Sequence, residues 1–246
     1  MSTLASAFLQ RPCVVEALAA PHTCRSVLNF FFGTRYLITR ADGEVACNPQ
    51  LDSWKAMSPM QSIWFGAPSL EYDTAARKFS ELIHASSTGQ LAFPGHGDET
   101  EWLTIHGLLA RILLADQYPR RVSRGTANAF AFDCVARSEV RTLLSEEGMR
   151  STISNLPAAG LLFVGMPLVH SERIHDHDTY ADFNQRCHRL HPTFPFMEQL
   201  SFALEHRNVV ARFGRYPHRN AILGRNSSAE EVRWLVSDER PLWAWV

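Results

Sequence analysis

Three short polar stretches of the chain combine arginine, histidine and carboxylate residues with the prolines and glycines typical of turns. They span residues 116–125, 166–172 and 212–225. Arginine recognises carboxylates and phosphates through paired hydrogen bonds, and histidine exchanges protons near neutral pH. We interpret the three stretches as parts of one site for an anionic or polar ligand. Its candidate binding residues are Asp116, Arg120, Arg124, His170, Glu172, Arg215, His218, Arg219, Asn220 and Arg225.

The first stretch places Arg120 and Arg124 just before a predicted helix. A cation is unfavourable there, because the amino end of a helix already carries partial positive charge. Pairing with Asp116 or Glu172 would remove the conflict, and so would an anionic ligand bound to free backbone N–H groups. Ligand binding and a purely structural Asp–Arg network both remain open.

The third stretch holds four arginines within fourteen residues, at 212, 215, 219 and 225. Like charges packed this closely repel one another unless carboxylates or a ligand lie between them. Pro217 disfavours helical geometry at Tyr216, so Arg215 and Arg219 need not lie one helical turn apart. A role in structure and a role in binding are again both open.

His170 and Glu172 lie close to the polar run 175–178, which could be read as a metal site. The spacing matches no established metal motif, and Ser171 lies in no nucleophile elbow. We therefore predict no metal and no cofactor. If the protein is an enzyme, its candidate catalytic residues are His170, Glu172 and His218.

Composition limits the class of protein. The chain has 246 residues, 46% hydrophobic and 20% charged, with a formal net charge of −1. This balance is ordinary for a globular domain and argues against non-specific nucleic-acid binding. Five cysteines without CxxC spacing indicate reduced thiols in a cytoplasmic protein. No apolar run approaches the roughly 18 residues needed to span a membrane.

Helical periodicity dominates the rest of the sequence. Apolar residues recur at three- and four-residue steps over 76–83, 105–113, 127–135, 180–190 and 196–204, and 156–164 is apolar throughout. Pro119 and Pro167 are expected to interrupt or end helices, and Ser228 to cap one. The pattern predicts an all-α fold made of an array of antiparallel helix hairpins.

We predict one helical domain over residues 27–246, preceded by an N-terminal extension over 1–26. The extension has a single acid, Glu16, and is interpreted as a flexible tail, with an organelle-targeting peptide as the alternative. Residues 34–62, with Gly43, Pro49 and Pro59, are expected to form a long loop. Asp42-Gly43 lacks β-branched flanks, so no hairpin is predicted there.

The polar stretches, together with several aromatic motifs, resemble domain-of-unknown-function family 924. The resemblance covers residues from about 27 to 236. It is carried by residues 27–33, 64–66, 72–73, 116–120, 124–126, 129–131, 133, 167–172 and 212–225. The chain departs from the family pattern in a longer segment before Trp64, in Arg121 where asparagine is common, and in His177 near a frequent glutamine.

The resemblance implies a tetratricopeptide-like all-α fold and no agreed activity. Fold analogy favours a binding module for a small anionic ligand or peptide. The alternative is an enzyme in which His170 or His218 moves a proton, Glu172 or Asp116 orients the histidine, and the arginines hold an anionic substrate. A third hypothesis gives the motifs a structural role alone. The sequence leaves the oligomeric state open.

Overall fold

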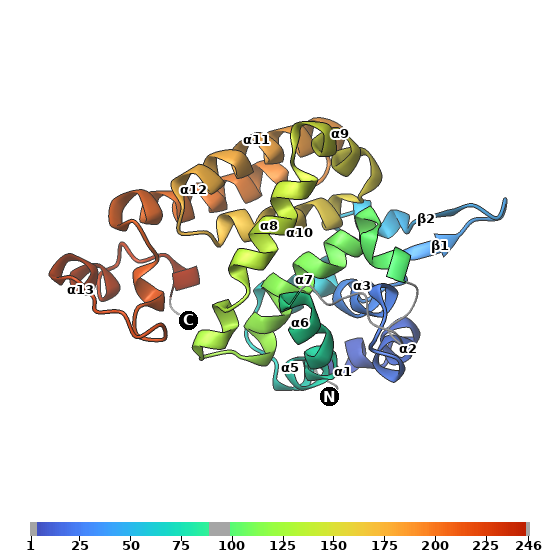
Figure 1. The fold of residues 1–246 in the computed structure, drawn as a ribbon, viewed down its shortest axis with the longest axis horizontal. Coiled ribbons are helices and arrows are strands. Elements are labelled where there is room, and N and C mark those ends of the chain that lie inside the picture. The colour runs from blue at the N-terminus through green and yellow to red at the C-terminus, as the bar shows by residue number, and fades with distance from the viewer. Residues whose placement is uncertain (1–3, 89–98, 245–246) are drawn as a thin grey trace.

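The computed structural model describes residues 4–88 and 99–244 and is essentially all-α, as predicted. Helices that follow one another along the chain pack side by side through short connections (Figure 1). The described elements are α1 (Leu4–Leu9), α2 (Pro12–Ala19), α3 (Cys24–Phe32), β1 (Leu37–Thr39), β2 (Val45–Cys47), η1 (Pro49–Asp52), α4 (Ser58–Phe65), α5 (Leu70–Ala76), η2 (Arg77–Phe79), α6 (Ser80–Ser87), η3 (Glu99–Leu103), α7 (Ile105–Val122), η4 (Ala127–Phe130), α8 (Asp133–Leu143), α9 (Glu146–Asn155), α10 (Ala158–Val169), α11 (Ile174–Leu190), α12 (Phe196–Phe213), η5 (Pro217–Arg219), α13 (Ala229–Leu235) and η6 (Leu242–Ala244).

Helix α10 is the centre of the fold, and every one of its residues is buried. It packs against α7, α8, α11 and α12. A Cβ atom on Gly165 would lie 2.6 Å from the Tyr180 ring, so only glycine allows α11 to approach this closely. An apolar helix buried on all sides has no amphipathic stripe, which explains why residues 156–164 were uniformly hydrophobic.

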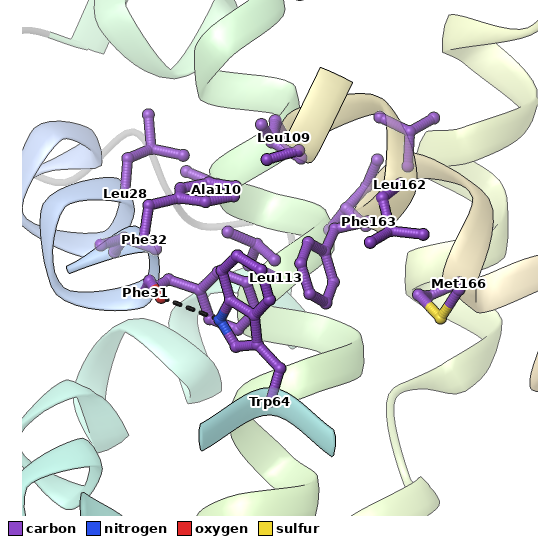
Figure 2. Packing of buried hydrophobic residues seen from close by; sticks show 14 of the residues in the cluster. Leu28, Phe31, Phe32, Trp64, Leu109, Ala110, Leu113, Leu162, Phe163 and Met166 are labelled. Atoms are coloured by element: carbon purple, nitrogen blue, oxygen red, sulfur yellow. Dashed lines mark hydrogen bonds between the residues drawn. The ribbon is translucent and has the colours of Figure 1, made fainter. Parts of the chain in front are cut away.

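Aromatic side chains join α10 to the amino-terminal helices (Figure 2). The Phe163 ring lies 4.6 Å from the ring of Phe31 and 4.9 Å from that of Trp64, centroid to centroid. The indole Nε1 of Trp64 donates a hydrogen bond to the Phe31 carbonyl at 3.1 Å. These contacts fix α3 and α4 against the central helix, because edge-to-face rings have defined geometry.

Two helices continue through prolines that were expected to stop them. Helix α7 passes Pro119 and ends at Val122, and α10 passes Pro167 and ends at Val169. Both prolines are buried in the last turns of their helices, where tertiary packing outweighs one lost backbone hydrogen bond. Arg120 therefore lies in the last turn of α7. A cation is favourable at that end, so the predicted conflict with a helix dipole was wrong.

Residues 4–26 form helices packed on the domain and are not a flexible tail. Phe8 is buried, with its ring centroid 5.7 Å from that of Phe30 and 5.4 Å from that of Tyr72. Arg11 Nη1 donates a hydrogen bond to the Gly33 carbonyl at 2.9 Å. Burial of a large ring supplies the contacts that hold this short helix in place.

The segment 34–62 also has more structure than the expected loop. Strands β1 and β2 pair antiparallel, with Leu37 opposite Cys47, and project from the helical body (Figure 1). Gly43 adopts a φ of 86° in the connecting turn. The three-residue strands are too short to show alternation in the sequence. After them, Asp52 Oδ1 accepts a hydrogen bond from the Ala158 N–H at 2.8 Å and so caps α10.

In the part of the chain that the structure describes, no helix is both long enough and apolar enough to cross a lipid bilayer.

We expect Phe8→Ala to lower the free energy of unfolding by about 3 kcal/mol, because it removes a buried ring from the contact between α1 and the domain. Leu4→Ala is the matched control on the same helix, since Leu4 is 53% exposed and should cost less than about 0.5 kcal/mol. Urea denaturation followed by circular dichroism measures both. Equal stability of the two variants would contradict the docking of α1.

Candidate functional site

A cavity of about 450 Å³ lies where α4, α7, α10 and α12 meet η4 and η5. Its polar wall consists of Gln117, Arg120, Arg121, Arg124, His170, His206, His218 and Arg219. Its aromatic wall consists of Trp64, Phe65, Phe130, Phe202 and Trp243. Each of the three polar stretches seen in the sequence contributes at least one residue, so the expected convergence occurs.

A second depression, of about 660 Å³, lies between α12 and the carboxyl-terminal segment. Its Arg212 pairs with Glu230 and Glu239, each at 2.9 Å. All three of these side chains are 45% or more exposed, so the charges are compensated and screened by solvent. We place the candidate site in the smaller cavity, because its arginines are more buried, with side chains between 8% and 32% exposed.

Asp116 and His170 form a buried pair at the base of the cavity. Asp116 is fully buried on α7, and His170 follows the last residue of α10. His170 Nδ1 lies 2.8 Å from Asp116 Oδ1 and 3.0 Å from Oδ2. Gln117 Nε2 donates a further hydrogen bond to Asp116 Oδ2 at 2.6 Å.

The charge state of this pair follows from its surroundings. Burial alone would raise the pKa of Asp116, but the Arg120 charge and the hydrogen bonds outweigh it and hold the pKa well below its usual value. Burial and the Arg120 charge together lower the pKa of His170, although Asp116 opposes them. At neutral pH the carboxylate is therefore ionised and the imidazole neutral. Nδ1 must carry the hydrogen that Asp116 accepts.

Arg120 and Arg219 share the second carboxylate of the site, Asp133 at the start of α8. Arg120 Nη1 lies 3.1 Å from Asp116 Oδ1 and 2.9 Å from Asp133 Oδ1. Arg219 lies 3.6 Å from Asp133 Oδ2, a weaker pairing, and donates to the His170 carbonyl at 3.0 Å. The Arg219 guanidinium also lies 4.7 Å from the centre of the Phe130 ring, a cation–π distance.

Arg121 and Arg124 share a single carboxylate, Asp73 of α5. Arg124 Nε donates to Asp73 Oδ2 at 3.3 Å, whereas Arg121 Nη1 is 3.9 Å from Oδ1. Arg121 also donates to the carbonyls of Ile63 and Trp64 at the end of α4. Arg124 Nη2 is buried and has no hydrogen-bond partner among the described residues.

Charges around the cavity do not balance. The four arginines in its wall contact three carboxylates, those of Asp73, Asp116 and Asp133. Arg219 Nε, like Arg124 Nη2, is a buried donor without a partner in the described part of the chain. A buried unpaired donor costs free energy unless something satisfies it. The wall therefore carries about one net positive charge, and the two unpaired donors are buried beneath its surface.

Two further histidines complete the wall. His206 Nδ1 donates to the Phe202 carbonyl at 2.9 Å, and its ring stacks on Trp243 with centroids 3.6 Å apart. His218 makes no hydrogen bond to the described residues, and its Nδ1 is buried. Burial lowers the pKa of each to about 3, so both are neutral at physiological pH. Within the described ranges, no three histidine, cysteine or acidic side chains gather as a metal site.

Five of the predicted site residues do not line the cavity: Asp116, which lies behind His170, and four that lie elsewhere. Glu172 binds Arg225 through two hydrogen bonds, at 2.7 and 2.9 Å, and accepts another from the Tyr216 N–H. Arg215 pairs with Glu231 of α13 at 2.6 Å, and Asn220 donates to Ser227 at 3.0 Å. These contacts join the carboxyl-terminal turns to the domain. Asp116, Arg120, Arg124, His170, His218 and Arg219 are brought together, with Asp116 behind His170.

The structure also identifies site residues that sequence reasoning missed. Asp73 lies in the first turn of α5 and Asp133 begins α8, so both look like ordinary acids near helix amino ends, although both belong to the motifs that carry the family resemblance. Arg121 was noted only as a departure from the family pattern. His206 sits within an apolar helical repeat, which carries no signal of a pocket. Local sequence cannot show which distant carboxylate will meet an arginine.

Comparison with other proteins agrees with the resemblance. Residues 27–239 match the model of a family described as "Bacterial protein of unknown function (DUF924)". A solved structure of a protein of unknown function from Agrobacterium tumefaciens is 31% identical, with a TM-score of 0.58, covering 74% of this chain and 92% of that one. No curated protein matches the chain. Because the family model spans most of its length, the chain belongs to the DUF924 family.

Proposed function

We propose that the cavity binds a small anionic molecule with a flat apolar body. The observation that carries the proposal is the imbalance of four arginines against three carboxylates in a wall that also contains five large aromatic side chains. A carboxylate or phosphate near Arg124 would neutralise the excess charge and accept charge-assisted hydrogen bonds from that guanidinium. Charge-assisted hydrogen bonds in a poorly hydrated site are strong enough to fix its orientation.

The aromatic wall of the cavity indicates that the remainder of the ligand is flat and apolar. Trp64, Phe65, Phe130 and Trp243 line the cavity and offer flat apolar surface. Rings bind other rings and planar groups by stacking or edge contact. A cavity of about 450 Å³ is within the usual size range of small-molecule sites and is too small for an extended peptide. We therefore favour a small molecule over a peptide, and over nucleic acid or a membrane surface.

A cytoplasmic location is part of the proposal. Cys13, Cys24 and Cys187 are buried free thiols, and Cys47 and Cys134 form no disulfide. Free thiols persist in reducing compartments.

We expect benzoate and phenyl phosphate to bind with affinities that fall as salt is added, because the interaction is between charges. The Arg124→Gln variant should bind them about tenfold more weakly, a loss of about 1.4 kcal/mol. Isothermal titration calorimetry measures each. Arg186→Gln is the matched control, since Arg186 pairs with Asp182 on the exposed face of α11. Equal binding of neutral benzyl alcohol, or no effect of Arg124→Gln, would contradict the proposal.

A structural role for part of the network is supported independently by the burial of Asp116. Removing one partner of a buried ion pair leaves the other uncompensated, so Asp116→Asn should lower the free energy of unfolding by about 3–5 kcal/mol at pH 7. Because the folded-state pKa of Asp116 is depressed, its stabilisation is present above the unfolded pKa of about 3.9 and is lost below it.

The difference between wild type and Asp116→Asn should therefore shrink as the pH falls below about 4. Urea denaturation at several pH values measures it. A difference that stays constant from pH 7 to pH 3 would show that the carboxylate charge is not the source of the stability.

A further inference from the structure

His170 differs from the other two histidines of the cavity in having a carboxylate on its ring. Its Nδ1 is turned toward Asp116, which is fully buried behind it and does not line the cavity. His206 uses its Nδ1 on a backbone carbonyl, and His218 makes no hydrogen bond within the described chain. A carboxylate on Nδ1 orients an imidazole and stabilises the imidazolium that forms when Nε2 takes a proton.

Because Nδ1 of His170 is hydrogen-bonded to Asp116, Nε2 is the ring nitrogen that can interact with a molecule in the cavity. It has no hydrogen-bond partner among the described residues, and the side chain lines the cavity wall while Nδ1 points away from it. Because Nδ1 holds the hydrogen, Nε2 carries a lone pair. The charged groups that face this ring are Asp116 and Arg120 of α7 and Arg219 of η5, and the neutral His206 of α12 lies near them. Burial of the ring and the Arg120 charge, opposed by Asp116, lower the pKa of His170 and keep the ring neutral at pH 7.

Arg219 is positioned beside this base. Arg219 lines the cavity, and its donation to the His170 carbonyl through Nη1 at 3.0 Å holds the guanidinium in place. Fixed donors of this kind stabilise an oxygen on which negative charge develops during a reaction. Among the described residues of the wall there is no serine, threonine, cysteine, lysine or carboxylate that could act as a covalent nucleophile. A water molecule is the nucleophile that this arrangement can activate.

We propose that the cavity hydrolyses a small anionic aryl ester, with His170 as the base that activates water; this inference rests on the proposed binding function. The water oxygen bonds to the ester carbonyl carbon while its proton passes to His170 Nε2. The carbonyl oxygen becomes an oxyanion next to Arg219. The tetrahedral species then breaks its bond to the leaving oxygen, which takes the proton back from His170. The products are a carboxylic acid and a phenol or alcohol.

The residues that line the cavity indicate which class of ester it would accept. The anionic group lies by Arg124, the aryl body lies among the rings, and the ester carbonyl lies by His170 and Arg219. Asp116 is a positioning residue, since it acts through His170. A suitable probe is 4-acetoxybenzoate, which has a carboxylate at one end of a ring and an acetyl ester at the other. Its hydrolysis yields acetate and 4-hydroxybenzoate.

The test measures release of 4-hydroxybenzoate by absorbance and binding of 4-hydroxybenzoate by calorimetry. We expect turnover by the wild type above the buffer rate, and a fall in kcat of at least about 100-fold in His170→Ala, the usual contribution of a general base. Binding should be retained in that variant. His175→Ala is the matched control, because His175 is exposed on α11 and away from the cavity, and it should keep the wild-type rate.

Each result decides between the two proposals. If the wild type binds 4-acetoxybenzoate but hydrolyses it no faster than buffer does, the hydrolytic inference is overturned and the binding function stands. Unchanged turnover in His170→Ala overturns it too. If neither the ester nor 4-hydroxybenzoate binds, both proposals fail. Circular dichroism checks the fold of His170→Ala; if that variant is unfolded, His170→Gln, whose amide can still reach Asp116, must show the same loss of kcat.

Discussion

Asp116 is a carboxylate without solvent contact at the point where α7 meets the end of α10. Burying such a charge is costly, and the cost is offset only by the groups that surround it. Gln117 and Arg120 lie on α7, the helix that carries Asp116 itself, whereas His170 comes from the turn before α11. Arg120 also forms an ion pair with Asp133 of α8, and Arg219 of η5 lies near the same carboxylate. The buried network around Asp116 therefore joins four segments, and the cavity lies where they meet.

Much of the helical fold could be predicted from the sequence, because buried faces impose a periodic pattern on residues close in the chain. The stripe over 105–113 lies on α7, and Ser228 caps α13 with Glu231 in a reciprocal capping box. The structural predictions that were wrong share one cause. Pro119, the short strands and the amino-terminal helices are all stabilised by contacts with distant residues, such as the Tyr118 hydroxyl with the Val27 carbonyl. Local propensity does not contain those contacts.

The candidate site was predictable to a similar degree. Residue type and turn chemistry selected Arg120, Arg124, His170 and Arg219, which do share a cavity. The same reasoning could not separate them from Arg215 and Arg225, whose carboxylates come from α13 and from the turn before α11. Paired and unpaired arginines look alike in a sequence. The distinction depends on how many carboxylates the fold places beside each arginine. Arg121 and Arg124 have only one between them, that of Asp73.

The cap on α10 links the segment that follows the β1–β2 hairpin to the candidate site. Asp52, just beyond the hairpin, holds the amino end of this helix, and His170 directly follows its carboxyl end, about 18 Å away at 1.5 Å per residue. No side chain of the helix is free to adjust independently, since all are enclosed. Such an element is a rigid spacer. It sets a fixed separation between the Asp52 carboxylate and the imidazole at the opposite end.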